Sequence, residues 1–356
     1  LPPAFILFLY IFLIMRNRER GIFMYQPAPT RYDSMKYRSC GRSGLKLPAI
    51  SLGLWHNFGD TGNFDNMKQL LFTAFDQGIT HFDLANNYGP APGSAERNFG
   101  RILKEDLASY RDELLISTKA GYDMWPGPYG NWGSRKYLLS SLDQSLKRMN
   151  LDYVDIFYHH RMDPETPLEE SMGALDQAVK SGKALYAGLS NYDGETMIKA
   201  CRILEDLRCP FVLNQNAYNI FNRTIEKNGL KQAAAEYGKG IIAFKPLEQG
   251  VLTDRYLNGI PEDSRIRTDG RFLHEDSLTE ERLTAVRKLN DMAGERGESL
   301  ASMAIKWVMK DDAVTGVLIG ASRPEQILEN LKALEGAPLS AEELQKIDEI
   351  VNPLPS

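Results

Sequence analysis

Cysteine is scarce in this sequence, which has three cysteines among 356 residues, Cys40, Cys201 and Cys209. An odd number without metal-ligand spacing excludes a disulfide framework and gives no support for a zinc site, so we expect no bound metal. Free thiols are usual in a reducing compartment, and we therefore expect a cytoplasmic protein.

The sequence also lacks a large excess of charge of either sign. Its 42 basic and 47 acidic residues give a formal net charge of −5. This balance provides no general attraction to nucleic acid or acidic membranes, so we expect neither as a partner. Hydrophobic residues make up 43% of the sequence, enough for a large core, and the expected partner is a small molecule. Whether the chain forms a homo-oligomer stays open.

The apolar run near the N-terminus is short for a membrane span. Ala4 to Met15 has twelve residues, against about 20 in a membrane-spanning helix. Three arginines follow the run, whereas the positive charges of a signal peptide precede the apolar segment. We interpret residues 1–36 as an extension outside the folded domain, disordered or read from an upstream start, with Met24 as the true first residue. An anchor held at the cytoplasmic face by the downstream charge is the alternative.

From Ile50 almost to the end, short apolar runs alternate with amphipathic helical patterns. This alternation is typical of repeated βα units and a parallel sheet. Eight units can be counted, and eight parallel strands close into a barrel without edges. We therefore predict one α/β domain over residues 37–352, a (β/α)8 TIM barrel. The expected strands are Ile50–Leu54, Ile79–Leu84, Leu114–Thr118, Val154–His159, Ala184–Gly188, Val212–Gln215, Ile241–Phe244 and Val314–Ile319.

Nine helical patterns accompany the eight strands, so one helix is additional, and we place it after the seventh strand. The expected helices are Asp65–Gln77, Ser94–Leu103, Arg135–Met149, Leu168–Lys180, Glu195–Leu207, Glu226–Tyr237, Thr279–Arg296, Ser299–Met309 and Glu325–Leu334.

Further elements are expected at the two ends of the barrel. Lys36–Ser39 and Lys46–Pro48 flank a turn-rich link and predict a β-hairpin that plugs the N-terminal end. Long connections at Ala120–Ser134 and Pro246–Leu278 are expected on the C-terminal face, where such loops are usually functional. The first connection is rich in aromatic residues, which either wall a substrate pocket or pin the loop to the surface.

Polar residues stand at the ends of the expected strands. Asp83 ends the second strand, Tyr88 follows in its loop, and Lys119 comes directly after the third strand. A buried lysine is costly unless a carboxylate pairs with it, and Asp83 on the neighbouring strand is the expected partner. Chemistry in (β/α) barrels occurs at this edge, so we expect Asp83 and Tyr88 to face one pocket.

Two histidines close the fourth strand. His159 and His160 point to opposite faces, so only one enters the barrel mouth, and alternation alone does not decide which. Arg161 follows at the mouth and either binds an anionic group of a substrate or pairs with a loop acid such as Asp163. The other histidines are interpreted as structural or solvent-facing: His56, His81 and His274.

These polar residues together resemble the aldo-keto reductase superfamily, over roughly Tyr37 to Asn352. No GxGxxG pattern follows the first strand, which disfavours a Rossmann domain. Within the superfamily the chain is similar to the branch of bacterial L-glyceraldehyde 3-phosphate reductases and potassium-channel β subunits. The motifs that carry the resemblance are Phe82-Asp83 with Tyr88-Gly89, Ser117-Thr118-Lys119, Asp155 before His160, Gly53–Gly59, Ser117–Gly130 and Leu318–Arg323.

The resemblance implies a catalytic tetrad of Asp83, Tyr88, Lys119 and His160, and it selects His160 over His159. In this chemistry, negative charge develops on the carbonyl oxygen as hydride arrives, so a proton donor is needed nearby. We expect the Lys119 ammonium to lower the pKa of Tyr88, which is the general acid. The residues implied to contact substrate are Trp55, Tyr88, Trp125, His160 and Arg161.

The implied cofactor is NADP(H). Arg323, in a loop that leads into a helix, resembles the family's site for the adenosine 2′-phosphate and favours NADP over NAD. Lys245 departs from the small polar residue that is usual at its position. The residues implied to bind the cofactor are Trp55, Asp83, Ser190, Asn191, Gln215, Phe244, Lys245, Leu247, Gln249, Arg255, Gly320, Ser322, Arg323, Gln326, Glu329 and Asn330.

The sequence therefore predicts an NADPH-dependent oxidoreductase of small aldehydes such as L-glyceraldehyde 3-phosphate or methylglyoxal. The alternative is an NADP(H)-binding regulatory subunit resembling channel β subunits, which an intact tetrad does not exclude. The loop from Trp125 to Tyr129 is similar to that of the reductases and favours the enzyme.

Overall fold

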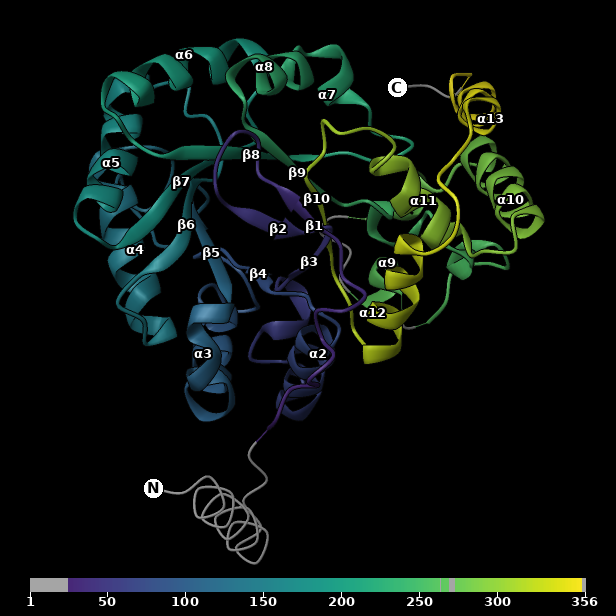
Figure 1. Ribbon diagram of the computed structural model, residues 1–356, viewed down its shortest axis with the longest axis horizontal. Helices are drawn as coiled ribbons and strands as arrows, with labels where there is room; N and C mark the ends of the chain where they lie inside the picture. The colour runs from purple at the N-terminus through teal and green to yellow at the C-terminus, as the bar shows by residue number, and fades with distance from the viewer. Residues whose placement is uncertain (1–24, 263, 269–272, 354–356) are drawn as a thin grey trace, which may run out of the picture.

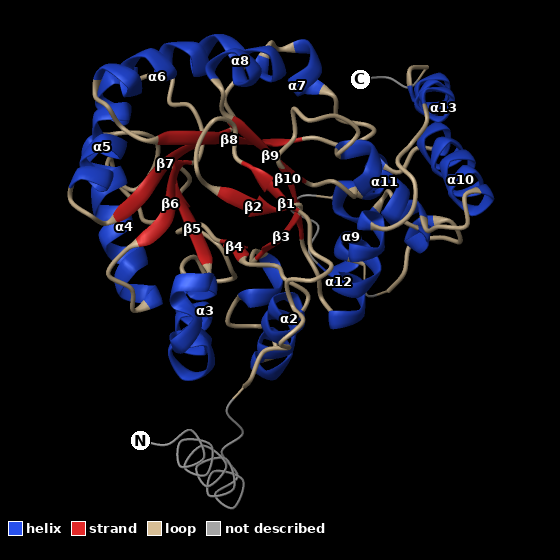
Figure 2. Ribbon diagram, viewed as in Figure 1, coloured by secondary structure: helices blue, strands red, loops and turns tan. Residues whose placement is uncertain are grey.

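The predicted barrel is confirmed. A computed structural model describes residues 25–262, 264–268 and 273–353. Within them eight parallel strands close in the order β10-β3-β4-β5-β6-β7-β8-β9, and helices surround the barrel (Figure 1, Figure 2). The barrel strands are β3 (Ile50–Gly53), β4 (His81–Asp83), β5 (Leu115–Ala120), β6 (Val154–His159), β7 (Ala184–Ser190), β8 (Phe211–Ala217), β9 (Gly240–Phe244) and β10 (Gly316–Ile319).

Strand β5 extends beyond the apolar run that predicted it. Lys119 pairs with Tyr158 in the parallel ladder to β6, so the strand continues to Ala120 and does not end at Thr118. Side chains alternate along a strand, so Leu115, Ser117 and Lys119 face the same side. The barrel interior therefore changes from apolar to polar toward the C-terminal ends of the strands, where the site is expected.

Most helices begin at caps that the sequence supplies. Asn63, Ser134 and Asp193 each accept a hydrogen bond from a backbone N–H three residues later. The helices outside the β9–β10 connection are α2 (Phe64–Asp76), α3 (Ser94–Ile102), α4 (Arg135–Met149), α5 (Leu168–Lys180), α6 (Gly194–Asp206), α7 (Thr224–Lys227), α8 (Leu230–Tyr237), α12 (Pro324–Leu331) and α13 (Ala341–Val351).

Two helix predictions need correction. The single helix expected over Glu226–Tyr237 is split, because Gly229 adopts φ 76° and ends the continuous turn between α7 and α8. Helix α13 was not predicted, although Ser340 and Glu343 form a capping box that the sequence pattern could have revealed.

The additional helical segment after the seventh barrel strand is confirmed. Between β9 and β10 lie α9 (Arg265–Thr268), α10 (Glu280–Glu295) and α11 (Leu300–Val308). Helices α10 and α13 contact each other at the periphery, on the side of α11 that faces away from the strands (Figure 1).

The predicted hairpin plugs the barrel. Strands β1 (Tyr37–Ser39) and β2 (Lys46–Pro48) pair antiparallel, and Leu47 is fully buried against the interior cluster that includes Ile156 and Leu213. This hairpin removes the N-terminal opening of the barrel from solvent and leaves the C-terminal face for a site.

Part of the N-terminal extension packs on the barrel helices. Tyr25 stacks on Phe72 of α2 with ring centroids 3.9 Å apart, and its hydroxyl donates to Asp76 at 2.8 Å. The apolar run and Met24 lie outside the described residues, so the interpretation of residues 1–24 stays a prediction. In the described part of the chain, the helices are too short or too polar to span a membrane.

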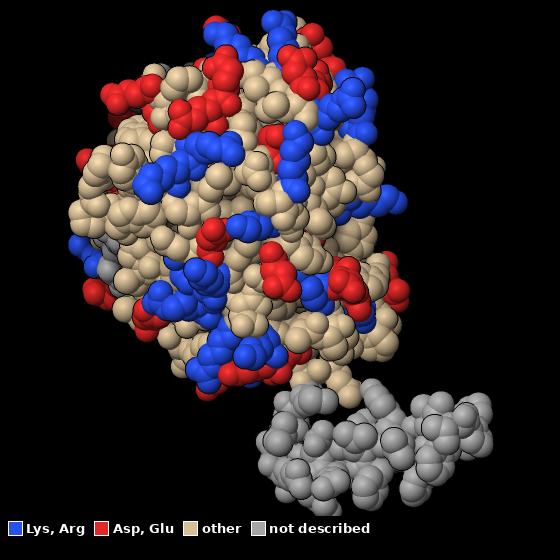
Figure 3. Space-filling view, turned by 90° about the vertical axis from the view of Figure 1, so that its left-hand side faces the viewer, with Lys and Arg blue, Asp and Glu red and all other residues tan. Residues whose placement is uncertain are grey.

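The molecular surface carries both signs of charge. On the face shown in Figure 3, basic and acidic side chains lie in small separate groups between wide areas of uncharged residues. The view fits the small net charge of −5.

Candidate functional site

A buried ion pair joins the ends of two neighbouring strands. Asp83 at the end of β4 binds the ammonium of Lys119 in β5, and both side chains are fully buried. The Lys119 Nζ also donates to the carbonyl oxygen of Leu84 at 2.7 Å and lies 3.4 Å from the hydroxyl oxygen of Tyr88. The expected pairing of Lys119 with Asp83 is confirmed, and it brings a phenol beside a buried cation.

The second carboxylate oxygen of Asp83 has partners of its own. The Ser117 hydroxyl donates to Oδ1 at 2.6 Å, and the Gln215 side-chain amide donates to the same oxygen from β8 at 3.2 Å. With Lys119 on Oδ2, the carboxylate accepts bonds from three side chains. Such bonds offset part of the cost of burying the charge.

The structure places His160, and not His159, beside the phenol. The ring of His160 lies 6.0 Å from the ring of Tyr88 and 4.6 Å from that of Tyr122, measured between centroids. His159 is fully buried, with Nδ1 2.7 Å from the hydroxyl oxygen of Tyr192. The two histidines therefore lie on opposite sides of β6, as alternation requires.

Burial shifts the titration of the phenol and the amine. Burial, followed by the charge of Asp83 and then Tyr122, raises the pKa of Tyr88 well above 10. Burial also lowers the pKa of Lys119, and Asp83 opposes that shift. The expected lowering of the Tyr88 pKa by Lys119 is therefore wrong, because Asp83 balances the ammonium charge and burial penalises phenolate. Tyr88 keeps its proton at neutral pH.

The imidazole of His160 is neutral at physiological pH. Burial, followed by the positive charge of Lys119 and then by the interactions with His159 and Arg161, holds its pKa well below 6.5. Its Nδ1 is buried without a hydrogen-bond partner among the described residues. A neutral imidazole can donate one hydrogen bond to a carbonyl oxygen, in addition to the proton donor.

Aromatic rings border the site, from two loops. Trp55 follows β3 and lies 6.1 Å from the Tyr88 ring. In the loop after β5, Tyr122 faces His160, whereas Trp125 packs on Tyr137 of α4 with centroids 5.4 Å apart. Of the aromatic residues expected in the loop after β5, Tyr122 lies beside His160, while Trp125 packs on a helix.

The side chain of Arg161 is held in place by contacts with the same loop. Its Nε donates to the Gly121 carbonyl at 2.9 Å and its Nη2 to Asn131 Oδ1 at 2.8 Å. The guanidinium lies between the rings of Tyr122 and Trp132, at 4.2 and 3.6 Å from their centroids. These contacts fix the orientation of a cation at the barrel mouth.

The alternative pairing of Arg161 with Asp163 is not found. Asp163 instead accepts hydrogen bonds from the Gly133 backbone at 2.9 Å and the Thr166 hydroxyl at 2.5 Å. The role of Arg161 as a substrate anchor stays a prediction.

Residues expected to hold a nicotinamide lie at the ends of β7, β8 and β9. Asn191 directly follows β7, and its Nδ2 donates to the His160 carbonyl at 3.0 Å and lies 3.1 Å from Ser190 Oγ. Gln215 lies in β8 and Phe244 ends β9. Gln215 donates to the Asp83 carboxylate, and the role of these side chains in holding a nicotinamide stays a prediction.

The segment after β9 has an unusual backbone. Lys245, Glu248 and Gln249 have φ values of 56°, 43° and 58°, a region rarely used by residues other than glycine. Asn219 donates to the Lys245 carbonyl at 2.9 Å, and Arg282 lies 3.4 Å from Glu248. Backbone strain held by such contacts is common at ligand-binding segments. The other expected residues of this segment are Leu247 and Arg255.

The loop after β10 leads into α12 through hydrogen bonds to the side chain of Gln326. Gln326 accepts from the Ser322 backbone at 2.7 Å and from its hydroxyl at 3.1 Å, which orders the turn from Gly320 into α12. Arg323 is exposed, and its guanidinium has no carboxylate partner in the described part of the chain. A free cation at a helix start fits a phosphate group. Asn330 is buried on the same helix.

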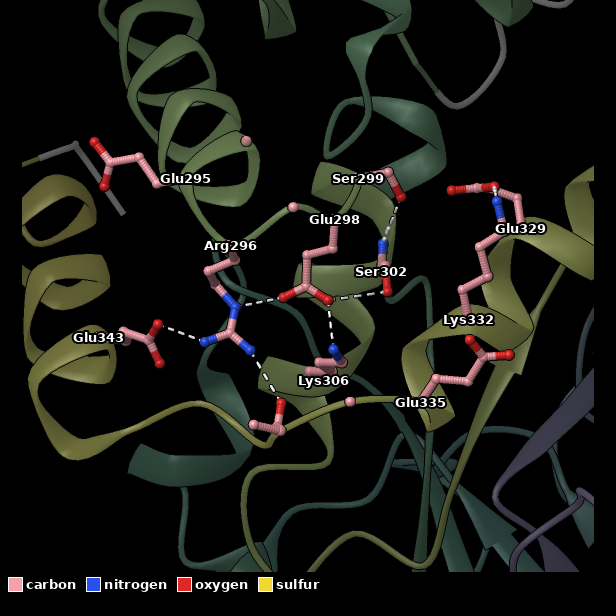
Figure 4. A pocket seen from close by; sticks show the side chains of 14 residues that line it. Glu295, Arg296, Glu298, Ser299, Ser302, Lys306, Glu329, Lys332, Glu335 and Glu343 are labelled. Carbon is pink, nitrogen blue, oxygen red and sulfur yellow. Dashed lines mark hydrogen bonds and ion pairs between the residues drawn. The ribbon is translucent and has the colours of Figure 1, made fainter.

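Glu329 has an ion-pair partner of its own on the following turn. It pairs with Lys332 at 2.6 Å and lines a cavity of about 700 Å³ outside the barrel, between α10, α11 and the segment before α13 (Figure 4). Arg296 and Glu298, which line the cavity, form an ion pair at 2.5 Å. Glu298 also binds Lys306, and Arg296 also binds Glu343, so several of the charged side chains in Figure 4 are paired with one another.

One buried polar group was not identified from the sequence as part of the site. His81, interpreted as structural or solvent-facing, is fully buried and lies 2.9 Å from both Ser51 Oγ and Ser117 Oγ. The signal was present, because residues two apart on a strand share a face and His81 precedes Asp83 by two. In the described ranges, no group of three or more His, Cys, Asp and Glu side chains is arranged to hold a metal ion.

Comparison with known proteins identifies relatives over nearly the whole chain. The family model described as "Aldo/keto reductase family" matches residues 49–352. The chain is 59% identical over 324 residues to "L-glyceraldehyde 3-phosphate reductase" from Escherichia coli O157:H7 and from Escherichia coli strain K12, covering 90% of this chain and 94% of each relative. It is 37% identical over 328 residues to "Probable voltage-gated potassium channel subunit beta" from Oryza sativa subsp. japonica, covering 90% of this chain and 98% of the relative.

The buried histidines predict that acid destabilises the fold. Burial lowers the pKa of His81 and His159 from 6.5 to about 4. Between these values the unfolded chain binds more protons than the folded chain, so stability falls as pH falls. From pH 7 to pH 5 each histidine should cost about 2 kcal/mol of unfolding free energy. Urea unfolding at the two pH values measures this loss.

The control for this prediction is a pair of histidine variants. His159→Gln should reduce the difference in unfolding free energy between pH 7 and pH 5 by about 2 kcal/mol. His274→Gln, which changes an exposed histidine, should leave the difference as in wild type. Equal pH dependence in wild type and His159→Gln would contradict the neutral buried state of His159.

Proposed function

Because the chain belongs to the aldo/keto reductase family, we propose that it is an NADPH-dependent reductase that converts small aldehydes to alcohols. The observation that carries the proposal is the phenol of Tyr88, whose hydroxyl oxygen lies 3.4 Å from the fully buried ammonium of Lys119. The relatives named as reductases at 59% identity support a phosphorylated short aldehyde as substrate.

The side chains can perform the protein's part of this reaction. A nicotinamide held by these residues would supply the hydride for the carbonyl carbon. Tyr88 transfers its proton to the carbonyl oxygen, and the phenolate left behind is stabilised by the ammonium of Lys119. The neutral imidazole of His160 donates a hydrogen bond that orients the same oxygen. Asp83 keeps Lys119 in place and does not contact substrate.

The proposed cofactor residues fit the groups of NADP(H). Ser190, Asn191 and Gln215 offer amide and hydroxyl groups to the carboxamide, and Phe244 offers a ring face to the nicotinamide. Arg323 offers an unpaired guanidinium to the 2′-phosphate. The proposed location is the cytoplasm.

A regulatory subunit that binds NADP(H) is the second candidate. The 37% identity to a potassium-channel subunit beta, over 90% of this chain, supports it. The two candidate functions differ in whether the protein turns over an aldehyde substrate. A purified protein that binds NADPH tightly but reduces no aldehyde of a broad panel would favour the regulatory role.

Tyr88→Phe should abolish aldehyde reduction while leaving NADPH affinity nearly unchanged. The hydroxyl acts on the substrate oxygen, and the phenylalanine ring keeps the packing against Trp55. Stopped-flow reduction and fluorescence titration with NADPH measure the two quantities. Turnover within a few fold of wild type would exclude Tyr88 as the proton donor.

Arg323→Ala should weaken the binding of NADPH much more than the binding of NADH, because only NADPH has a 2′-phosphate. A lost charge-assisted bond corresponds to about 1.5–3 kcal/mol, or roughly ten- to a hundredfold in dissociation constant. Lys332→Ala removes a nearby positive charge that pairs with Glu329, and it should affect neither cofactor. If Arg323→Ala weakened the binding of both cofactors equally, the 2′-phosphate would not be bound by Arg323.

Arg161→Met should raise KM for L-glyceraldehyde 3-phosphate about tenfold, which corresponds to ~1.4 kcal/mol of lost binding. KM for methylglyoxal, which carries no phosphate, should change little. Steady-state kinetics with both substrates measure the difference. Because Arg161 also clamps the loop through Gly121 and Asn131, an equal loss for both substrates would mean that it only holds the loop.

A further inference from the structure

The interior of the barrel has an unexpected polar layer below the ion pair. Ser51, His81 and Ser117, on β3, β4 and β5, are all fully buried and bonded in series, and we refer to them as the His81 network. Branched apolar residues usually fill this part of a (β/α)8 barrel. Buried polar groups are costly unless each is hydrogen-bonded.

The hydrogen-bond donors and acceptors of the His81 network follow from the Asp83 carboxylate, to which Ser117 is bonded. An ionised carboxylate only accepts, so the Ser117 hydroxyl donates to Asp83 at 2.6 Å. The Ser117 oxygen then accepts from His81 Nε2–H at 2.9 Å, and His81 Nδ1 accepts from the Ser51 hydroxyl at 2.9 Å. This assigns the neutral Nε2–H tautomer to His81, in agreement with its burial.

We propose that His81 and Ser117 are positioning residues that orient the Asp83 carboxylate and thereby hold the Lys119 ammonium beside Tyr88. The proposal rests on the proposed reductase function. Without the Ser117 hydroxyl, Asp83 Oδ1 retains only Gln215, at 3.2 Å. The carboxylate can then rotate about χ2, a torsion angle with a broad energy minimum in aspartate. This rotation moves Oδ2 away from the Lys119 Nζ.

The role of Gln215 makes the Ser117 bond important when cofactor binds. The same Gln215 amide that donates to Asp83 is proposed to bind the nicotinamide carboxamide. If that amide turns to the cofactor, Ser117 is the remaining donor to Asp83 Oδ1 among the bonds described. The His81 network therefore leaves Gln215 available for the cofactor without loss of the carboxylate's orientation.

A change in the orientation of Asp83 should appear in the pH profile of kcat. Burial lowers the pKa of Lys119 and Asp83 opposes the shift, so a displaced carboxylate makes the lysine neutral at lower pH. The fall of kcat on the alkaline side of its pH profile should then begin at lower pH. The groups that face Lys119 or Asp83 are His81 on β4, Tyr88 in the following loop, Glu96 on α3, Tyr158 on β6, His160 after β6 and Gln215 on β8.

The test compares variants that remove or retain the donors of the network. Ser117→Ala and His81→Leu should each lower kcat at least about tenfold, with the alkaline limb moved to lower pH and aldehyde KM within twofold of wild type. His81→Gln places an amide N–H near the position of Nε2 and should restore most of the activity. Near-wild-type thermal unfolding of each variant shows that the fold is kept.

Ser302→Ala is the matched control. The Ser302 hydroxyl is also buried and also donates to a carboxylate, Glu298 at 3.3 Å, but on α11 outside the barrel (Figure 4). This variant should keep wild-type kcat and pH profile. An unchanged kcat and pH profile in Ser117→Ala would overturn the proposal, as would His81→Gln being as inactive as His81→Leu. If His81→Leu does not fold, Ser117→Ala, which removes one oxygen atom, decides.

A measurement without turnover separates this proposal from the proposed function. Long-range 1H–15N spectra of histidine-labelled wild type, with the His81 signals assigned from His81→Gln, should show the neutral Nε2–H tautomer at pH 7. The Nδ1–H tautomer would overturn the network, because Nε2 would then carry no hydrogen and the Ser117 hydroxyl would have to donate to His81 instead of to Asp83. Wild type without aldehyde reduction but with the Nε2–H tautomer would contradict only the reductase function.

Discussion

A fully buried ammonium is the constraint on which the site depends. Moving an amine and a carboxylate out of water costs several kcal/mol for each ion, and their mutual attraction offsets this only when the remaining donors and acceptors are satisfied. Here Lys119 has the Asp83 carboxylate and the Leu84 carbonyl, and Asp83 has Ser117 and Gln215. The strands that supply these partners must therefore meet at one edge of the barrel.

The barrel meets this requirement through a gradient of polarity along its interior. The hairpin closes the N-terminal end with Leu47, and the inward residues of β5 then progress from Leu115 through Ser117 to Lys119. Apolar packing at the closed end keeps water out, and hydrogen bonds at the open end hold the charges. Tyr88 therefore lies next to a buried cation with its own pKa raised by burial, and in the proposed reaction that cation would stabilise the phenolate.

The loops at the open end have more than one structural task. The loop after β5 places Tyr122 against His160 and also holds Arg161 between two rings, so the order of the loop and the position of Arg161 are coupled. Gln215 donates to Asp83 in the barrel and is also the residue proposed for the cofactor amide. Changes at such residues therefore affect more than one contact at once.

The sequence by itself determined the eight βα units, the hairpin and the polar strand ends, because period-2 and period-3.6 patterns are local and survive without tertiary contacts. It could also have revealed helix α13 through its capping box. The tertiary structure alone decided three matters. It placed the Asp163 carboxylate on Gly133 and Thr166, reversed the expected pKa shift of Tyr88, and bonded His81 to Ser117. Each depends on burial and on partners from distant segments, which a linear pattern of residues does not contain.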